Sequence, residues 1–285
     1  MELKTLRVEQ HGAVATIWIH RPHRNNAWTG TMHGEFRAVM DELDNDDTVR
    51  VVVITGDGRM FCPGADGAAL ASHVERGGYD PGTPDDLVDP AYGVRPQFAA
   101  DFAWMLGLRV VTIAAMNGAA AGAGLVRACY CDLRFAAAGA KFTTAHGKLN
   151  YPAEYGLSWL LPRLVGLTHA NDLLLSSRVF LAEEAEAMGM VNQVLPANEV
   201  YPAAMAYAEQ LVTQVSPASL ATTKRQIAVD LLHNDPAHAV RQAQALIELM
   251  ATQPDFVEAM RVFMREPDAE WSQPPHAFEP PGRPL

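Results

Sequence analysis

Two segments rich in Gly and Ala could bind a carbonyl oxygen through their backbone amides. They are DGRMFCPGAD, residues 57–66, and NGAAAGAG, residues 117–124. At Gly64 and Ala65 a ligand could approach the main chain, and a helix expected to begin near Asp66 would direct free N–H groups at it. The first amides of a second expected helix, around Ala123, have the same character. Two such donors on one oxygen are worth roughly 3–4 kcal/mol each. The alternative for the first segment is an ordinary tight turn.

Two ionisable side chains farther along the chain could move protons. An imidazole titrates near neutrality, so His146 could act as a base; alternatively, it fills a packed wall and is held by a backbone carbonyl. Glu154 stands where a helix is expected to begin, so it either caps that helix or does chemistry. The three Cys are an odd number with no nearby His, which favours buried thiols and disfavours a disulfide framework or a metal site.

Runs of β-branched residues predict the strands that position these segments. Such runs, each ending in turn-forming residues, cover residues 13–20 and 49–56, and two further strands are expected over residues 109–118 and 132–140. Between the first two runs, apolar residues at helical spacing from Met32 to Leu43 predict an amphipathic helix capped by Thr29 or Thr31. Strands separated by helices imply a parallel or mixed sheet. The sequence therefore predicts an α/β fold.

Beyond residue 140 the strand pattern stops and helices are expected. Several of them open with Pro, which the first helical turn tolerates, and they cover residues 155–165, 169–176, 182–188, 202–215, 217–232, 236–250 and 254–264. Residues 77–96 and the Pro-rich end of the chain are expected to be irregular. We expect a core over residues 1–200, a helical region over 201–265 and an extended tail over 266–285.

The composition excludes several classes of protein. The chain has 285 residues, 49% hydrophobic and 19% charged, which suits a substantial core and not a disordered chain. A net charge of −11 disfavours nucleic acid as a partner, because phosphate binding needs clustered Lys and Arg. The first residues show no apolar signal segment, and residues 110–126 are too short and too rich in Gly to span a membrane. We therefore expect a cytoplasmic protein that binds neither nucleic acid nor membrane.

Several motifs together resemble the crotonase, or enoyl-CoA hydratase/isomerase, superfamily. From about residue 8 to about residue 264 they read, in order, HRPHRNNAW, FCPGAD, AAMNGAAAGAG, LLPRLVG and FLAEEAEAMGMVNQV. The resemblance implies a spiral ββα core and a helical C-terminal trimerisation region, assembled as a homotrimer or a dimer of trimers. It also implies an acyl-CoA substrate and no separate cofactor, because coenzyme A is part of the substrate. The amides of Ala65 and Ala123 match the positions that bind the thioester oxygen.

The same resemblance implies a set of coenzyme A contacts. The matching positions are His23, Arg24, Asn25, Gly64, Asp66, Gly67, Phe263 and Arg265. The first three would hold the nucleotide, and the segment from Gly64 to Gly67 would line the pantetheine. The last two would reach the coenzyme A of a neighbouring subunit. Glu266 stands where a Lys is common in the family. The alternative for Arg24 is that it is only a solvated charge on the surface.

The catalytic positions depart from the hydratase pattern. Typical hydratases of this family use two Glu, and alignment places Val126 and His146 there; a Val cannot transfer a proton. Glu154, in AEYGLSWLLPR, takes the place of the acidic residue of enoyl-CoA isomerases. Isomerisation needs one base, so the residues favour double-bond isomerisation by Glu154. The alternatives are a hydratase that uses Glu154 with His146, and a non-catalytic binder of acyl-CoA.

Overall fold

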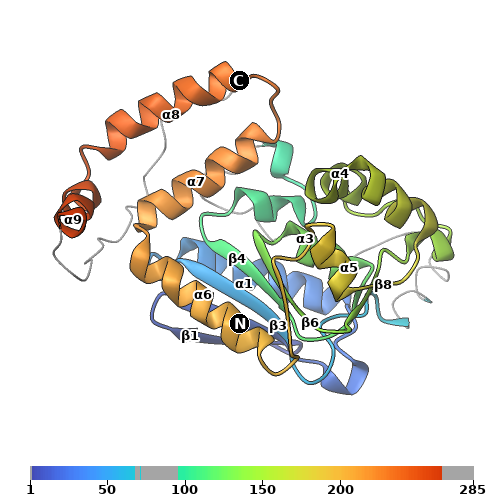
Figure 1. The fold of residues 1–285 in the computed structure, drawn as a ribbon. Coiled ribbons are helices and arrows are strands. Elements are labelled where there is room, and N and C mark those ends of the chain that lie inside the picture. Colours follow the sequence, from blue (N-terminus) through green and yellow to red (C-terminus); the bar gives the residue numbers. More distant parts are fainter. Residues whose placement is uncertain (1, 68–70, 72–95, 265–285) are drawn as a thin grey trace.

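A six-stranded sheet lies at the centre of the computed structural model, which describes residues 2–67, 71 and 96–264 (Figure 1). In spatial order its strands are β1 (Leu6–His11), β2 (Val14–Ile19), β3 (Val51–Gly56), β4 (Val111–Met116), β6 (Leu133–Ala137) and β9 (Gln193–Leu195). The first pair is antiparallel and the other pairs are parallel. Every residue of β3 and β4 is buried, as expected of central parallel strands covered on both faces. The four predicted strands correspond to β2, β3, β4 and β6, so the predicted α/β class is confirmed.

A second sheet consists of the short strands β5 (Ala120–Ala121), β7 (Lys141–Thr143) and β8 (Phe180–Leu181). The prediction that strands stop after residue 140 is therefore wrong, because β7, β8 and β9 all lie beyond it. Each of these strands is only two or three residues long. That length shows neither alternation nor a β-branched run, which are the signals by which a strand is recognised in a sequence.

Helices cover both faces of the large sheet. Helix α1 (Gly30–Asn45) lies behind it in Figure 1, and α6 (Val200–Gln214) crosses in front, packed against β2, β3, β4 and β6. The predicted cap of α1 is Thr29, whose hydroxyl accepts a hydrogen bond from the amide of Met32 at 3.2 Å. Helix α3 (Ala123–Tyr130) follows the small strand β5 and is buried along its whole length.

The remaining helices all lie beyond β7 in the chain. Helix α4 (Leu157–Ser176) joins the two helices predicted over this range, and non-helical dihedral angles at Gly166 break it between them. Helix α5 (Ala182–Ala187) is short. Helices α7 (Pro217–Asp230), α8 (Pro236–Met250) and α9 (Pro254–Phe263) each begin with Pro, as predicted. In Figure 1 α8 and α9 form an arm that projects away from the sheet.

Several predictions concern residues that the structure leaves undescribed. The segment 77–96 lies outside the described residues except for Pro96, which begins a short 3₁₀ helix, Pro96–Phe98. The tail over residues 266–285 is also outside them, as are Arg265 and Glu266. Among the described helices, none has both the length and the apolar character that crossing a bilayer requires. All three Cys are buried and free, as predicted.

Candidate active site

The two segments rich in Gly and Ala lie against each other in matched register. Cys62 and Ala120 form a parallel bridge, in which the Cys62 amide donates to the carbonyl of Ala119 at 3.2 Å and the Cys62 carbonyl accepts from Ala121 at 3.0 Å. Counting three residues onward along both strands reaches Ala65 and Ala123. Ala65 and Ala123 therefore occupy matching positions on two backbone segments that are paired at Cys62 and Ala120.

Glycine makes this close approach possible. Gly64 has a φ of +100°, and a side chain there would place its Cβ only 2.9 Å from the carbonyl oxygen of Ala121. Gly122 has a φ of +47°, and its Cβ would lie 4.0 Å from the Cα of Gly64. A larger residue at position 64 would force the segments apart and separate the amides that follow, whereas at position 122 the positive φ is what disfavours a side chain.

The amides of Ala65 and Ala123 have no hydrogen-bond acceptor among the residues that the structure describes. Hydrogen bonds to Trp28 hold the residues on either side of Ala65, at 2.7 Å from Gly64 and 2.8 Å from Asp66. Ala123 is the first residue of α3, whose N-terminus has no side-chain cap. Within the described part of the chain, neither amide donates to another residue. Unpaired amides at the N-terminus of a helix attract negative charge, so this pair could bind an oxyanion.

Glu154 lines a cavity of about 430 Å³ together with Asp101 and residues 151–155. Helix α4 begins at Leu157, and its N-cap, Gly156, receives no side-chain hydrogen bond. Glu154 therefore lies two residues before the N-cap and outside the helix. Partial burial raises the pKa of Glu154 above its ordinary value. A carboxyl in this condition can give and take a proton closer to neutral pH than an exposed one.

Two contacts connect the Glu154 segment to the rest of the candidate site. The hydroxyl of Tyr130, the last residue of α3, donates to the carbonyl of Tyr155 at 2.8 Å. The ring of Tyr155 also packs edge-to-face against Phe102, with 4.8 Å between the ring centroids. Burial raises the pKa of Tyr155 to about 12, so its phenol is neutral at physiological pH. The helix that begins at Ala123 thus ends on the segment that carries Glu154.

His146 is held in a packed wall. It is 5% exposed, and its Nε2–H donates to the carbonyl oxygen of Leu174 at 3.0 Å. Its Nδ1 has no hydrogen-bond partner among the described residues. The interpretation of His146 as a packed residue expects a hydrogen bond from its ring to a backbone carbonyl, and the structure has this hydrogen bond. Val126, at the other hydratase position, is 1% exposed and one turn into α3.

The residues predicted to contact coenzyme A differ in their exposure to solvent. His23 and Arg24 are exposed on the short 3₁₀ helix Pro22–Arg24, and Asn25 follows it with a φ of 52°. Asp66 is 8% exposed and its carboxylate pairs with Arg21 at 3.1 Å, so it orders the loop beside Gly64. Phe263 ends α9, and its side chain lies outside the description, as does Arg265.

Arg127 is a buried charge that the sequence analysis did not single out. It is 0% exposed, and its guanidinium carbon lies 3.8 Å from the centroid of the Trp28 ring. Burial lowers the pKa of Arg127, and the sulfur atoms of Cys62 and Cys131 oppose that change. Its three side-chain nitrogens have no hydrogen-bond partner among the described residues. The sequence signal was a lone charge inside an otherwise apolar helix.

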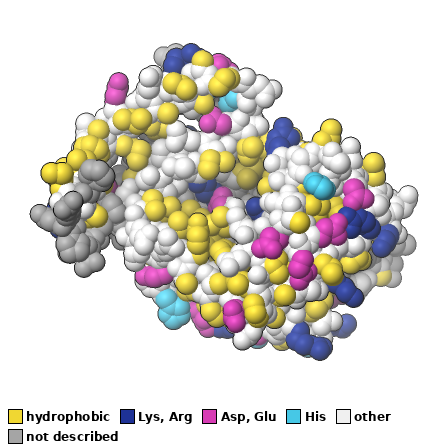
Figure 2. Space-filling view, viewed as in Figure 1, with side chains coloured by type: hydrophobic (Ala, Val, Ile, Leu, Met, Phe, Trp, Pro, Cys, Tyr) yellow, Lys and Arg dark blue, Asp and Glu magenta, His cyan; other side chains and the backbone are white. Residues whose placement is uncertain are grey.

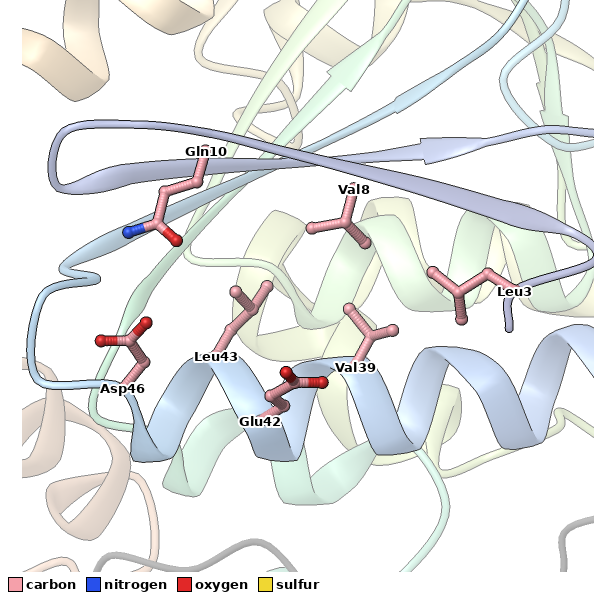
Figure 3. Close-up of a pocket in the computed structure, with 7 residues that line it drawn as sticks. All are labelled: Leu3, Val8, Gln10, Val39, Glu42, Leu43 and Asp46. Atoms are coloured by element: carbon pink, nitrogen blue, oxygen red, sulfur yellow. The ribbon is translucent and has the colours of Figure 1, made fainter. Parts of the chain in front are cut away.

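A second cavity, of about 290 Å³, lies between β1 and α1 (Figure 3). Figure 3 shows Val8 above the apolar side chains of Val39 and Leu43 on the helix, with Glu42 also on the helix and Asp46 directly after its end. None of the predicted site residues lines this cavity. In the described ranges, no three His, Cys, Asp or Glu side chains group in a way that could hold a metal ion.

Comparison with known proteins identifies the family. The family model for enoyl-CoA hydratase/isomerase matches residues 9–274. The chain is 36% identical over 188 residues to the probable enoyl-CoA hydratase echA12 of Mycobacterium tuberculosis, a match that spans 64% of this chain and 62% of that relative. It is 32% identical over 261 residues to the probable enoyl-CoA hydratase echA14 of the same organism, covering 87% and 96% of the two chains.

A relative of a different name and a solved structure agree with this result. The 1,2-epoxyphenylacetyl-CoA isomerase of Escherichia coli is 33% identical over 214 residues, covering 75% of this chain and 78% of the relative. The crystal structure of a probable enoyl-CoA hydratase/isomerase from Mycobacterium abscessus matches with a TM-score of 0.82 and 30% identity, covering 94% of this chain and 99% of that one. The chain therefore belongs to the enoyl-CoA hydratase/isomerase, or crotonase, family, and the crotonase fold predicted from the sequence is confirmed.

Proposed function

We propose that this chain is a cytoplasmic enzyme that moves the double bond of an enoyl-CoA thioester, with Glu154 as both base and acid. The observation that carries the proposal is the environment of Glu154. This carboxyl lines a cavity of about 430 Å³ and has a raised pKa. Val126 and His146 stand at the two hydratase positions, where one cannot transfer a proton and the other is bonded to a backbone carbonyl. Of the acid–base positions predicted from the sequence, Glu154 alone remains as a proton-transferring group, and one such group suffices for a 1,3-proton shift.

The reaction needs one base and one oxyanion site. Glu154 removes the α proton of a β,γ-unsaturated thioester, and the electron pair of the broken C–H bond delocalises into a dienolate. The amides of Ala65 and Ala123 donate to the thioester oxygen, where the negative charge develops. Glu154 then returns the proton to the γ carbon, which gives the α,β-unsaturated product. Atoms and charge balance without any other reactant.

The rest of the proposal concerns binding and assembly. His23, Arg24 and Asn25 would hold the nucleotide of coenzyme A, and the loop from Gly64 to Gly67 would line the pantetheine. Phe263 and Arg265 would reach the coenzyme A bound to a neighbouring subunit of a homotrimer or of a dimer of trimers. No separate cofactor takes part, because coenzyme A belongs to the substrate.

A second candidate function is hydration of a 2-enoyl-CoA. It is favoured by the printed names of the two mycobacterial relatives, echA12 and echA14, both probable enoyl-CoA hydratases. The isomerase candidate is favoured by the E. coli relative, 1,2-epoxyphenylacetyl-CoA isomerase. In a hydratase, Glu154 would act with a second group, and His146 is the candidate from the sequence. A protein that binds acyl-CoA without turnover is the third alternative.

The decisive experiment follows the double bond. Purified protein is incubated separately with trans-3-hexenoyl-CoA and trans-2-hexenoyl-CoA, and products are separated by chromatography. We expect conversion of the 3-enoyl to the 2-enoyl ester, a loss of at least about 100-fold in Glu154→Gln, and no loss in Glu209→Gln. Glu209 is exposed on α6 and serves as the matched control. Hydration of the 2-enoyl ester that survives Glu154→Gln would overturn the assignment, and binding without either reaction would support the binder.

A variant of His146 separates its two interpretations. In His146→Gln the side-chain amide keeps an N–H donor for the carbonyl of Leu174 but cannot act as a base near neutral pH. If the ring only packs, this variant keeps its activity. A loss of 100-fold or so with an unchanged KM would instead assign proton transfer to His146.

A further inference from the structure

The cavity of Glu154 contains a second carboxylate that comes from a distant part of the chain. Asp101 follows the 3₁₀ helix Pro96–Phe98 and lines the same cavity of about 430 Å³. Its sequence neighbour Phe102 packs on Tyr155, the neighbour of Glu154, with ring centroids 4.8 Å apart. The two aromatic rings therefore tie together the two backbone segments that carry the carboxylates.

Both of these aromatic residues have unusual backbone conformations. Phe102 has a φ of 61° and Tyr155 a φ of 49°. Bulky L-residues rarely adopt positive φ, and such conformations persist where the surrounding structure imposes them. Here the conformation on each side places a carboxylate beside the cavity. Strain on both walls of one cavity is more typical of a site than of ordinary packing.

His33 holds Asp101 in place. This imidazole, on α1, is 3% exposed, and its Nε2 lies 3.4 Å from Oδ1 of Asp101. An ionised carboxylate only accepts hydrogen bonds, so Nε2 carries the proton in this contact. The Nδ1 atom has no hydrogen-bond partner within the described ranges. His33 is itself enclosed by Trp28 and Phe102, whose ring centroids lie 6.0 and 5.3 Å away, so it cannot swing out of the contact.

The environments of the two carboxyl groups shift their pKa values in opposite directions. The hydrogen bond from His33 lowers the pKa of Asp101, although burial opposes it, and the positive charge of Arg37 adds to the lowering. Burial raises the pKa of Glu154. Two carboxyl groups of one cavity whose environments separate their proton affinities divide into a base and an acid. Asp101 suits the role of base, and Glu154 that of acid.

We propose that Asp101, positioned by His33, is the water-activating base for the hydration of 2-enoyl thioesters, the second candidate function, in place of His146. The inference rests on the proposed acyl-CoA function and adds to it. Asp101 takes a proton from water as the water oxygen bonds to the β carbon. The C=C electron pair moves toward the α carbon, which accepts the proton of Glu154. Asp101 then passes its proton to solvent and Glu154 takes one up, so that one water adds to one enoyl ester.

This assignment replaces the acid–base pair that is missing at the family positions. Val126 has no ionisable group, and the Nε2–H of His146 is occupied by Leu174. Asp101 would supply the second group from another direction, on the segment that precedes β4. The enzyme would then convert a 3-enoyl ester first to the 2-enoyl ester and next to the 3-hydroxyacyl ester.

The test uses the full-length protein with trans-3-hexenoyl-CoA and measures both steps. We expect Asp101→Asn to lower hydration by roughly 10²–10⁴-fold while isomerisation through Glu154 persists, so that the 2-enoyl ester accumulates. Glu154→Gln should lose both steps, and Asp101→Glu should recover part of the hydration. Glu209→Gln is the control, and circular dichroism during heating verifies that each variant is folded.

The role of His33 has its own readout. His33→Leu removes the donor to Asp101 and should lower the kcat of hydration about 10-fold or more without a matching change in KM. His33→Gln restores an N–H near the position of Nε2 and should recover most of that loss. A purely structural role would lower both steps together and would not be rescued in this way.

Each remaining outcome decides between the proposals. Wild-type protein that isomerises but never hydrates overturns the role of Asp101 and leaves the proposed function intact. Hydration in folded Asp101→Asn within about threefold of wild type overturns it as well, and so does equal loss of both steps in this variant. Isomerisation that is absent in the wild type, while hydration depends on Asp101, overturns the proposed function instead.

Discussion

The hydroxyl of Tyr130 donates a hydrogen bond to the carbonyl oxygen of Tyr155 at 2.8 Å. This contact joins the C-terminal end of α3, whose first amide is that of Ala123, to the segment that carries Glu154. The space that the hydroxyl occupies exists because residue 156 is Gly: a Cβ there would lie 2.8 Å from the Tyr130 oxygen. The Tyr130 hydroxyl is therefore one of the contacts that hold the segment of Glu154 relative to α3.

Removing this hydroxyl should loosen the site without unfolding it. Tyr130→Phe leaves the Tyr155 carbonyl without its partner, and we expect the free energy of unfolding to fall by about 1–2 kcal/mol. The kcat should fall by roughly 10-fold to 100-fold with little change in KM, because the proton-transferring group is displaced relative to the bound thioester. Steady-state kinetics and urea denaturation measure the two effects.

The matched control is Tyr207→Phe. The ring of Tyr207 packs on Phe135 and the residue is 38% exposed, and its hydroxyl makes no hydrogen bond to a described residue. It should leave both quantities unchanged. A kcat in Tyr130→Phe equal to that of the control would contradict the positioning role.

Gly64 is expected to be intolerant of a methyl group. Gly64→Ala adds the strain of a positive φ and brings Cβ to 2.9 Å from the Ala121 carbonyl oxygen, so the free energy of unfolding should fall by about 1–3 kcal/mol. The Ala65 amide would move with it, and loss of one oxyanion donor lowers kcat by roughly 10²–10³-fold.

Gly12→Ala is the control that measures the cost of a positive φ without any steric clash. Gly12 has a φ of +57°, with no atom within 4 Å of a Cβ placed there, and it lies in the turn between β1 and β2. This variant should lose at most about 1–2 kcal/mol and no activity. Equal activity losses in the two variants would show that positive φ alone, and not the contact between the loops, explains the result.

The parts of the fold that the sequence predicts are those with long local signals. Strands β2, β3 and β4 contain buried runs of β-branched residues, β6 is a short and mostly apolar run, and Thr29 is a local cap. Strand β1 was missed because its residues are only partly buried and mostly polar, LRVEQH. Strands β7 and β8 exist because distant segments pair, which no local window contains.

The candidate site shows the same division. The Gly and Ala residues around Ala65 and Ala123 are local signals, and the structure places the two segments in register. The contact between His33 and Asp101 joins residues on α1 and on the segment before β4, and neither stands in a motif. Such a pair depends on how α1 packs against that segment, so it becomes visible only once the tertiary structure is known.

The arm formed by α8 and α9 should mediate assembly. Its exposed apolar side chains are Val240, Ile247, Phe256, Val257, Met260 and Met264. Figure 2 shows hydrophobic side chains gathered along this arm. Apolar surface of this kind is typically covered by another chain. Light scattering should give a mass that is a multiple of three times 31.0 kDa, and the pair Ile247→Glu and Val257→Glu should reduce it. Gln214→Glu, which adds one negative charge to α6, should not; an unchanged mass in the arm variant as well would contradict the role of the arm.

Two buried arginines should respond oppositely to the same substitution. Arg127→Met removes a charge with no hydrogen-bond partner among the described residues, so we expect the free energy of unfolding to rise by about 1–4 kcal/mol, less what the contact with Trp28 contributes. Arg134→Met should instead destabilise, because the Arg134 side chain donates to four backbone carbonyls, including that of Met190 at 2.6 Å. Urea denaturation compares them. A loss of stability in both variants would mean that the charge of Arg127 is compensated.

The pH dependence of stability should distinguish Glu154 from Asp101. Burial raises the pKa of Glu154 above 4.5, so the folded protein binds this proton more tightly than the unfolded chain. Its contribution therefore becomes unfavourable as the pH rises from about 4.5 through the folded pKa. Glu154→Gln removes that penalty, and its stability relative to wild type should increase between about pH 4 and pH 7.

For Asp101 the sign is reversed. The hydrogen bond from His33 lowers the pKa of this carboxyl below 3.8, so the ionised group stabilises the fold above that pH and the contribution is lost as the pH falls through the folded pKa. Asp101→Asn should therefore become less stable than wild type as the pH rises. Urea denaturation at a series of pH values measures both variants, and their stability differences from wild type should diverge with rising pH. Parallel curves would mean that the two carboxyl groups share one environment, and the division into a base and an acid would fail.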